Sequence, residues 1–189
     1  HDERMFRAQF MKDIPLGYIE MRQAFDPAGA YGKWMRERPA IVIINGIAFV
    51  HGGINGSTAM LGCHGINDAV RRDAVTPNPT AEQAFAMFSS SETGPLWYRG
   101  LADEPEAAFA PELTGILKTL GARKIVIGHT LSAGFRIATR FDGRVIQIDT
   151  GMLGGTHYQG GVASALEIRG AVLPAIYESG GERLPAPAP

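Results

Sequence analysis

Two histidines follow short apolar runs, and each stands beside glycine. Ile47–Val50 leads into His51, and Lys124–Ile127 leads through Gly128 into His129. Such runs are typical of buried strands, and a polar residue after a strand lies at the sheet edge, where glycine leaves room for an ion or a substrate. Either histidine alone would more often be a hydrogen-bonded residue at a strand end. Because imidazole is a good ligand for zinc, iron and manganese, the repeated pattern favours a shared metal site.

An arginine in the loop between these histidines could bind phosphate. Arg99 follows Trp97 and Tyr98 in a stretch flanked by glycine. A guanidinium is suited to bidentate capture of phosphate oxygens. A single loop arginine is often only a solvated charge, but the two aromatic residues could anchor this loop and aim its guanidinium.

Three further polar residues follow the second histidine. Asp149 ends an apolar run and could approach the same site, or it could cap the glycine turn that follows. Tyr158 lies in a glycine-rich loop and could contact a substrate, whereas its neighbour His157 is interpreted as a surface residue. The glycines of this loop match no nucleotide-binding spacing.

The elements that must position these residues alternate between strand and helix patterns. Hairpins are predicted at residues 41–50, 135–149 and 163–177, the first around Asn45-Gly46, with two arms apolar enough to be buried on both faces. Residues 1–38 look helical and irregular. Helices are predicted at 31–38, 58–74, 81–88 and 111–120, the last with Pro111 near its start and Gly121 at its end. This mixture favours a layered α/β or α+β domain.

Composition agrees with one globular domain. The chain has 189 residues, 45% of them hydrophobic, and a formal net charge of −1. Without a basic run, a nucleic-acid partner is not expected, and no apolar stretch is long enough for a membrane span. Cys63 is the only cysteine, so no internal disulfide can form; we expect it and His64 to be structural. We expect residues 1–180 to be one folded portion and 181–189 a proline-rich mobile tail.

Several of these motifs occur together in an order that resembles the calcineurin-like metallophosphoesterases, and most of all their bacterial Shewanella-like phosphoprotein phosphatase branch. The resemblance covers roughly residues 15–168. The motifs are FVHGGI at 49–54, GPLWYR at 94–99, IGHT at 127–130, IDTGM at 148–152 and ALEI at 165–168. The HGG and GHT motifs are moderately specific alone, and together with PLWYR in this order they are a strong indication of the family.

The resemblance implies the C-terminal half of a four-layer α-β-β-α sandwich, with two mixed sheets face to face and helices outside. It implies two divalent or trivalent metal ions (manganese, iron or zinc), with His51 and His129 as ligands of the second ion. Arg99 matches the phosphate-gripping arginine of the family by its place between the histidines. A hydroxide that bridges the two ions would attack phosphorus in line, while the ions stabilise charge on the phosphoryl oxygens.

The family's upstream motifs GDxHG, GDxxDRG and GNHE are not complete in this chain. His1-Asp2 could end a GNHD or GNHE motif, and His1 would then be the general acid, although the family usually places more residues between that motif and the 31–32 region. We therefore expect activity to need an upstream N-terminal half, which supplies the first metal site.

The leading hypothesis is metal-dependent hydrolysis of phosphate monoesters, with a phosphorylated protein or a small phosphoester as substrate. The first alternative is a phosphodiesterase with the same metal centre. The second is a non-catalytic half-domain that binds an ion or a partner without turnover.

Overall fold

The computed structural model describes residues 2–76, 80–170 and 172–184, and the chain forms two compact units. The first unit, His1–Pro39, is helical, as the sequence predicts. Its helices are α1 (Asp2–Asp13), α2 (Tyr18–Phe25) and α3 (Ala30–Glu37). The side chain of Asp26 accepts a hydrogen bond from the Ala28 N–H at 2.9 Å and so stabilises the predicted turn between α2 and α3.

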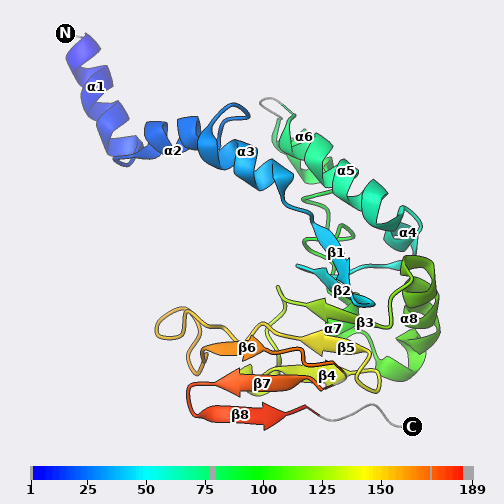
Figure 1. Cartoon of the computed structure of the whole chain (residues 1–189). Helices are drawn as coiled ribbons and strands as arrows, with labels where there is room; N and C mark the ends of the chain where they lie inside the picture. Colours follow the sequence, from blue (N-terminus) through cyan, green and yellow to red (C-terminus); the bar gives the residue numbers. More distant parts are fainter. Residues whose placement is uncertain (1, 77–79, 171, 185–189) are drawn as a thin grey trace. The chain divides into compact units, whose positions relative to one another are not determined.

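The second unit, Ala40–Pro189, is built on a five-stranded mixed sheet in the order β1-β2-β3-β5-β4. Its strands are β1 (Ile41–Ile44), β2 (Ile47–Val50), β3 (Lys124–Ile127), β4 (Ala138–Arg140) and β5 (Val145–Gln147). The three central strands β2, β3 and β5 are parallel, and β1 and β4 pair antiparallel with their neighbours (Figure 1). The carboxyl ends of the central strands therefore meet at one edge of the sheet.

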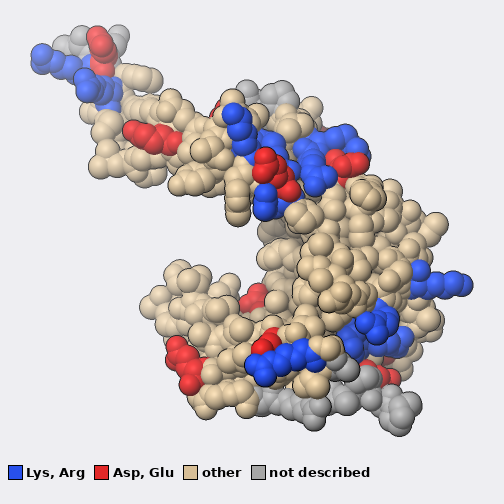
Figure 2. All heavy atoms as spheres, viewed as in Figure 1, with Lys and Arg blue, Asp and Glu red and all other residues tan. Residues whose placement is uncertain are grey.

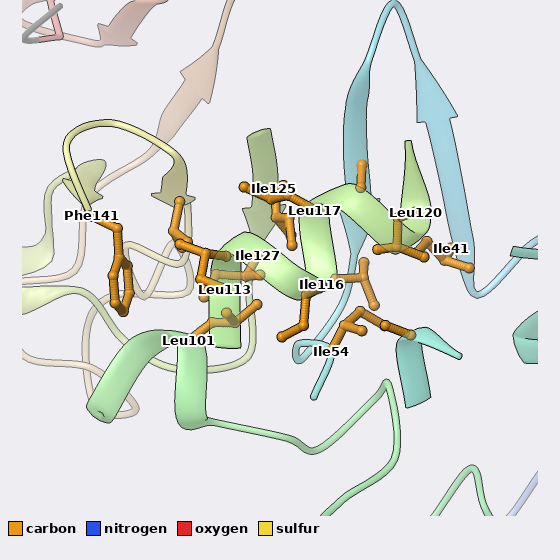
Figure 3. Close-up of a cluster of buried hydrophobic side chains, with 14 of the residues drawn as sticks. Ile41, Ile54, Leu101, Leu113, Ile116, Leu117, Leu120, Ile125, Ile127 and Phe141 are labelled. Atoms are coloured by element: carbon orange, nitrogen blue, oxygen red, sulfur yellow. The ribbon is translucent and has the colours of Figure 1, made fainter. Parts of the chain in front are cut away.

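Helices cover one face of this sheet. The helices of this unit are α4 (Gly56–Ala59), α5 (Gly62–Ala74), α6 (Ala81–Ala86), α7 (Gly100–Asp103) and α8 (Glu106–Leu120). All but α6, which has no buried residue, contribute side chains to the core on this face. Figure 3 shows the core beneath them: Leu113, Ile116 and Leu117 of α8 pack against Ile125 and Ile127 of β3. Burial of these side chains fixes the central strands, and with them the strand ends that carry the predicted site.

A second, three-stranded sheet covers the opposite face. It is antiparallel, in the order β6 (Ser164–Leu166), β7 (Pro174–Tyr177), β8 (Gly180–Arg183). Ala175 and Tyr177 of β7 are buried with Val126 and Ile146 of the first sheet, so the two sheets stack. The α/β fold with two stacked sheets is confirmed, and the second sheet is antiparallel rather than mixed.

Two features of the strands differ from the prediction. On the edge strand β1, Val42 and Ile44 are 36% and 53% exposed, so this arm of the first hairpin is not buried on both faces. Residues 180–183 form β8, and Leu184 is 8% exposed, so the folded part extends past residue 180. The rest of the expected tail, 185–189, lies outside the described residues.

Two helix predictions also change. The helix expected at 58–74 is divided into α4 and α5, because Gly62 has a φ of 63°. Helix α8 begins at Glu106, five residues before Pro111, because the helix-favouring segment before the proline buries Phe109. The predicted end at Gly121, with a φ of 65°, is confirmed.

The charges of the described residues form a mixed surface. On the face that Figure 2 shows, acidic and basic side chains are interspersed, in agreement with the small net charge of the chain. Among the helices that the structure describes, none is long and apolar enough to cross a bilayer.

Candidate active site

The predicted site lies at the carboxyl ends of the three parallel strands. His51 follows β2, His129 follows β3 after Gly128, and Asp149 follows β5 after one intervening residue. The strands are in register, with Val50 opposite Ile127. The N–H of Gly128 extends this pairing by donating to the carbonyl of His51 at 2.8 Å. Sheet register, rather than proximity in sequence, therefore brings the two histidines together.

The two imidazole rings lie close together at a tilted angle. The ring centroids of His51 and His129 are 5.1 Å apart, with an angle of 57° between the ring planes. Nε2 of His129 is buried and has no hydrogen-bond partner in the part of the chain that the structure describes. Burial lowers the pKa of His129, and Arg99 and His51 lower it further, while Asp149 acts in the opposite direction. The net lowering of its pKa favours the neutral ring, which is the form of imidazole that binds metal ions.

The sharp turn at this position is made by His129 itself. Its φ is 62°, in the left-handed region that non-glycine residues seldom adopt. The neighbouring Gly128 does not have a positive φ, so the left-handed conformation belongs to the histidine and not to the glycine. Backbone strain of this kind clusters at functional sites, where the surrounding structure holds it in place.

The glycines after His51 allow the loop that carries Arg99 to approach. A Cβ on Gly52 would lie 2.7 Å from the backbone carbon of Leu96, and one on Gly53 would lie 2.8 Å from the carbonyl oxygen of Tyr98. The N–H groups of both glycines donate to the carbonyl of Pro95, at 2.9 and 3.2 Å. The two predicted motifs thus pack directly against each other.

This contact places Trp97 and Arg99 beside the histidines. The indole of Trp97 lies edge-to-face with the His129 ring, at 5.0 Å between centroids and 81° between planes. Arg99 is exposed, and it is close enough to lower the pKa of His129. Tyr98 instead packs against the hydrophobic core and anchors the loop, as the sequence suggested. The direct contact of Trp97 with His129 was not expected, although the aromatic pair was a usable signal.

Asp149 both caps the glycine turn that follows it and lies near His129. Its Oδ1 accepts a hydrogen bond from the Gly151 N–H at 3.1 Å, so it does cap the turn. It is also near enough to raise the pKa of His129. Its main-chain carbonyl accepts hydrogen bonds from both the N–H and the hydroxyl of Ser132, each at 3.0 Å. Ser132, which the sequence did not single out, therefore ties the segment after His129 to Asp149.

The remaining predicted residues are placed as follows. Tyr158 packs against Gly151: a Cβ on that glycine would lie 2.9 Å from the Cβ of Tyr158. Its predicted contact with phosphate stays a prediction. His157 and His64 are exposed, and Cys63 packs against the core. His1, the predicted general acid, lies outside the described residues.

The residues present fit part of a two-metal centre. His51 and His129 could offer two imidazole nitrogen ligands to one ion, and Nε2 of His129 is buried with no hydrogen-bond partner among the described residues, so it is free to bind a metal ion. Among the described residues, no three histidine, cysteine, aspartate or glutamate side chains are grouped so that they could hold a metal ion. Further ligands are therefore required for a complete centre.

The chain is similar in sequence and in fold to known protein phosphatases. The chain is 30% identical over 137 residues to Shewanella-like protein phosphatase 1 of Plasmodium berghei (strain Anka), which covers 70% of this chain and 38% of that protein. A solved cold-active protein tyrosine phosphatase superposes with a TM-score of 0.69 and 25% identity, over 86% of this chain and 46% of its own. This chain is a relative of the Shewanella-like protein phosphatases.

A further structure supports that relationship. The cold-active protein-tyrosine phosphatase of a psychrophilic Shewanella species matches with a TM-score of 0.65 and 26% identity, over 82% of this chain and 45% of its own. The chain therefore spans less than half the length of each of these three proteins. No family model matches the chain.

Proposed function

We propose that this chain forms one side of the active site of a metal-dependent phosphoric monoester hydrolase. Its substrate would be a phosphorylated protein or a small phosphoester. The observation that carries the proposal is the close pair of His51 and His129, whose ring centroids are 5.1 Å apart, at the ends of neighbouring parallel strands. The relatives named as protein phosphatases support the reaction class.

Each residue has a distinct role in this proposal. His51 and His129 hold one of two divalent or trivalent metal ions (manganese, iron or zinc), which requires both rings to be neutral. Bound metal ions would supply an activated water nucleophile and would stabilise charge on the phosphoryl oxygens. Arg99 binds two phosphate oxygens and aligns phosphorus for attack. Asp149, beside His129, offsets part of the positive charge that Arg99 brings to the site.

We propose further that a second polypeptide segment, such as the remainder of the relatives provides, completes the site. Val42 and Ile44 lie opposite Phe49 and Ile47, which are covered by the second sheet, yet Val42 and Ile44 are themselves exposed. The exposed side chains of Val42 and Ile44 thus continue the face of the first sheet that the second sheet covers. Further strands could pack on this apolar surface. Such a segment would bring the carboxylate that must bridge two ions.

The direct test is hydrolysis of p-nitrophenyl phosphate in the presence of Mn²⁺. The chain is assayed alone and then joined to its upstream coding region. We expect activity in the longer protein. His51→Ala and His129→Ala should each lower kcat/KM by roughly 100-fold or more and reduce the bound metal. His64→Ala, on an exposed side chain of α5, is the matched control and should leave both unchanged.

Two outcomes would defeat this proposal. Absence of hydrolysis in the longer protein would favour a non-catalytic domain that binds an ion or a partner. Faster hydrolysis of bis(p-nitrophenyl) phosphate than of the monoester would favour a phosphodiesterase.

Arg99 is tested by phosphate inhibition. Arg99→Ala should raise the inhibition constant of inorganic phosphate, and Arg99→Lys should restore only part of the affinity, because an ammonium cannot form the bidentate contact. An inhibition constant that is unaltered in Arg99→Ala would remove this role.

A further inference from the structure

We infer that a cavity beside the proposed metal site binds an apolar side chain that flanks the phosphorylated residue of a protein substrate. The inference rests on the proposed function and adds a second binding site to it. The cavity lies within the second unit and has a volume of about 380 Å³, toward the small end of the range for ligand pockets. Its lining includes Arg136, Met152, Val162, Ala163, Tyr177 and Glu178.

The cavity is built by the same two segments that carry the site. Met152 stands three positions after Asp149, and three residues of extended chain span at most about 11 Å. In the other segment, which follows His129, the hydroxyl of Ser132 donates to the carbonyls of both Arg136 and Asp149. A peptide whose phosphate lies at the two histidines therefore reaches the cavity with a residue about two to four positions away.

One wall of the cavity is formed before any substrate binds. It belongs to the segment that joins β5 to β6 (Figure 1). The N–H of Val162 donates to the Thr150 carbonyl at 3.1 Å, and the Thr150 hydroxyl donates to the Val162 carbonyl at 2.8 Å. A Cβ on Gly161 would overlap the carbonyl oxygen of Gly151, so the two ends of this segment are in direct contact. Because these ends are tied together, little conformational freedom is lost when a side chain enters.

The chemistry of the lining favours a neutral side chain. The guanidinium of Arg136 lies over the ring of Tyr177, 4.0 Å from its centroid, and Glu178 brings a negative charge to the same cavity. A charged side chain would be attracted by one of these groups and repelled by the other. Met152 and Val162 are 61% and 37% exposed, so apolar surface remains that a leucine or methionine side chain would cover. The flexible thioether of Met152 can adapt to either shape.

The experiment measures which flanking residue a peptide substrate needs. The chain with its upstream coding region is given peptides that carry one phosphoserine or one phosphotyrosine. In each series, leucine, alanine, aspartate or lysine stands at each of the four positions on either side of the phosphorylated residue. We expect leucine at one of these positions to lower KM roughly five- to tenfold relative to alanine, and neither charged residue to do so.

Variants of Met152 assign this preference to the cavity. Met152→Ala should lower the advantage of leucine over alanine roughly threefold or more, because it removes apolar surface from the wall. Met152→Leu should keep most of the advantage, since it conserves volume and apolar character. Met60→Ala is the control: Met60 follows α4, is 76% exposed and lies outside the cavity lining, so the preference should not change.

Hydrolysis of p-nitrophenyl phosphate, which has no flanking residue, tests the proposed function separately. If neither this ester nor the peptides are hydrolysed, the proposed function fails. Equal affinities of the leucine and alanine phosphopeptides, measured by fluorescence anisotropy, would then also overturn the inference. If p-nitrophenyl phosphate is hydrolysed but leucine gives no advantage at any position, or Met152→Ala keeps that advantage in full, the inference alone is overturned.

Discussion

At Gly52, the segment that follows His51 packs most closely against the loop that carries Trp97 and Arg99. A Cβ there would lie 2.7 Å from the Leu96 carbonyl carbon and 2.8 Å from the Trp97 nitrogen, and neither backbone atom can move aside freely. We expect Gly52→Ala to lower the free energy of unfolding by about 1–3 kcal/mol. It should also disturb the contact between Trp97 and His129.

A second glycine in the chain provides the control for Gly52. Gly115 lies inside α8, and a Cβ on it would meet nothing within 4 Å. Gly115→Ala should therefore stabilise the protein by about 0.5–1 kcal/mol, because alanine favours the helix. Urea unfolding of both variants is the measurement. Equal effects of the two substitutions would contradict the close approach seen at Gly52.

Tyr98 gives the fold a specific response to high pH. Burial raises the pKa of Tyr98 to about 12, and the carboxylates of Glu112 and Glu104 contribute in the same direction. In the unfolded chain the phenol ionises near pH 10, so between about pH 10 and 12 the folded state holds a proton that the unfolded state has lost. The contribution of Tyr98 to stability is therefore complete below pH 10 and is lost as the pH rises toward 12.

The measurement is the free energy of unfolding at pH 8 and at pH 11, for the wild type and for Tyr98→Phe. The variant lacks the ionising group, so its stability should fall less between these two values. The comparison at pH 8 reports any loss of packing separately. A decline of the same size in both proteins would show that Tyr98 ionises alike in the folded and unfolded states.

Part of the site could be predicted from residue types alone. His51 and His129 were paired because each follows an apolar run, and the parallel register of β2 and β3 brings them together. The left-handed conformation of His129 could not be predicted, since histidine rarely adopts it without support from the surrounding structure. The contact of Trp97 with His129 depends on how closely two loops pack, and sequence spacing contains no such information.

Among the elements, β1 is held to α5 by one amide side chain. Oδ1 of Asn67 accepts hydrogen bonds from the N–H groups of Ala40 and Ile41, at 2.7 and 3.0 Å, and its Nδ2 donates to the Ile41 carbonyl at 3.0 Å. Asn67→Ala leaves these partly buried groups unsatisfied. We expect a loss of about 1–3 kcal/mol in the free energy of unfolding.

The matched variant is Asn67→Asp. It keeps an oxygen that can accept from the N–H groups of Ala40 and Ile41, but it replaces the Nδ2 group that donates to the Ile41 carbonyl. It should lose less stability than Asn67→Ala, and hydrogen exchange of the Ile41 amide should remain slower than in that variant. Fast exchange at Ile41 already in the wild type would contradict the proposed tie.

The prediction of elements succeeded where local signals were strong. The hairpin of β1 and β2 turns at Asn45 and Gly46, whose φ values of 52° and 75° suit a two-residue turn of this composition. The exposure of Val42 and Ile44 on β1 was missed, because an apolar run does not reveal whether a strand lies at the edge of its sheet. Strand β8 was missed because its glycine-rich segment lacks strand residues; pairing with β7 holds it in place.

At the scale of the whole molecule, the fold explains why this chain offers two of the proposed metal ligands and why the proposed centre needs more. The parallel strands deliver His51 and His129 to one edge of the sheet, and the relatives are more than twice as long as the part that this chain matches. A two-metal site needs carboxylates in addition to imidazoles. The proposal that a further segment supplies them follows from this shortage of ligands together with the uncovered apolar surface of β1.

The most direct test of the central claim is a titration of the histidine-labelled chain with Mn²⁺, followed by NMR. Paramagnetic broadening detects even weak binding and falls off steeply with distance. We expect the ring signals of His51 and His129 to broaden together, before those of His64 and His157. In His129→Ala the broadening at His51 should largely disappear. Broadening that spares both His51 and His129, or reaches His64 and His157 equally early, would contradict the account.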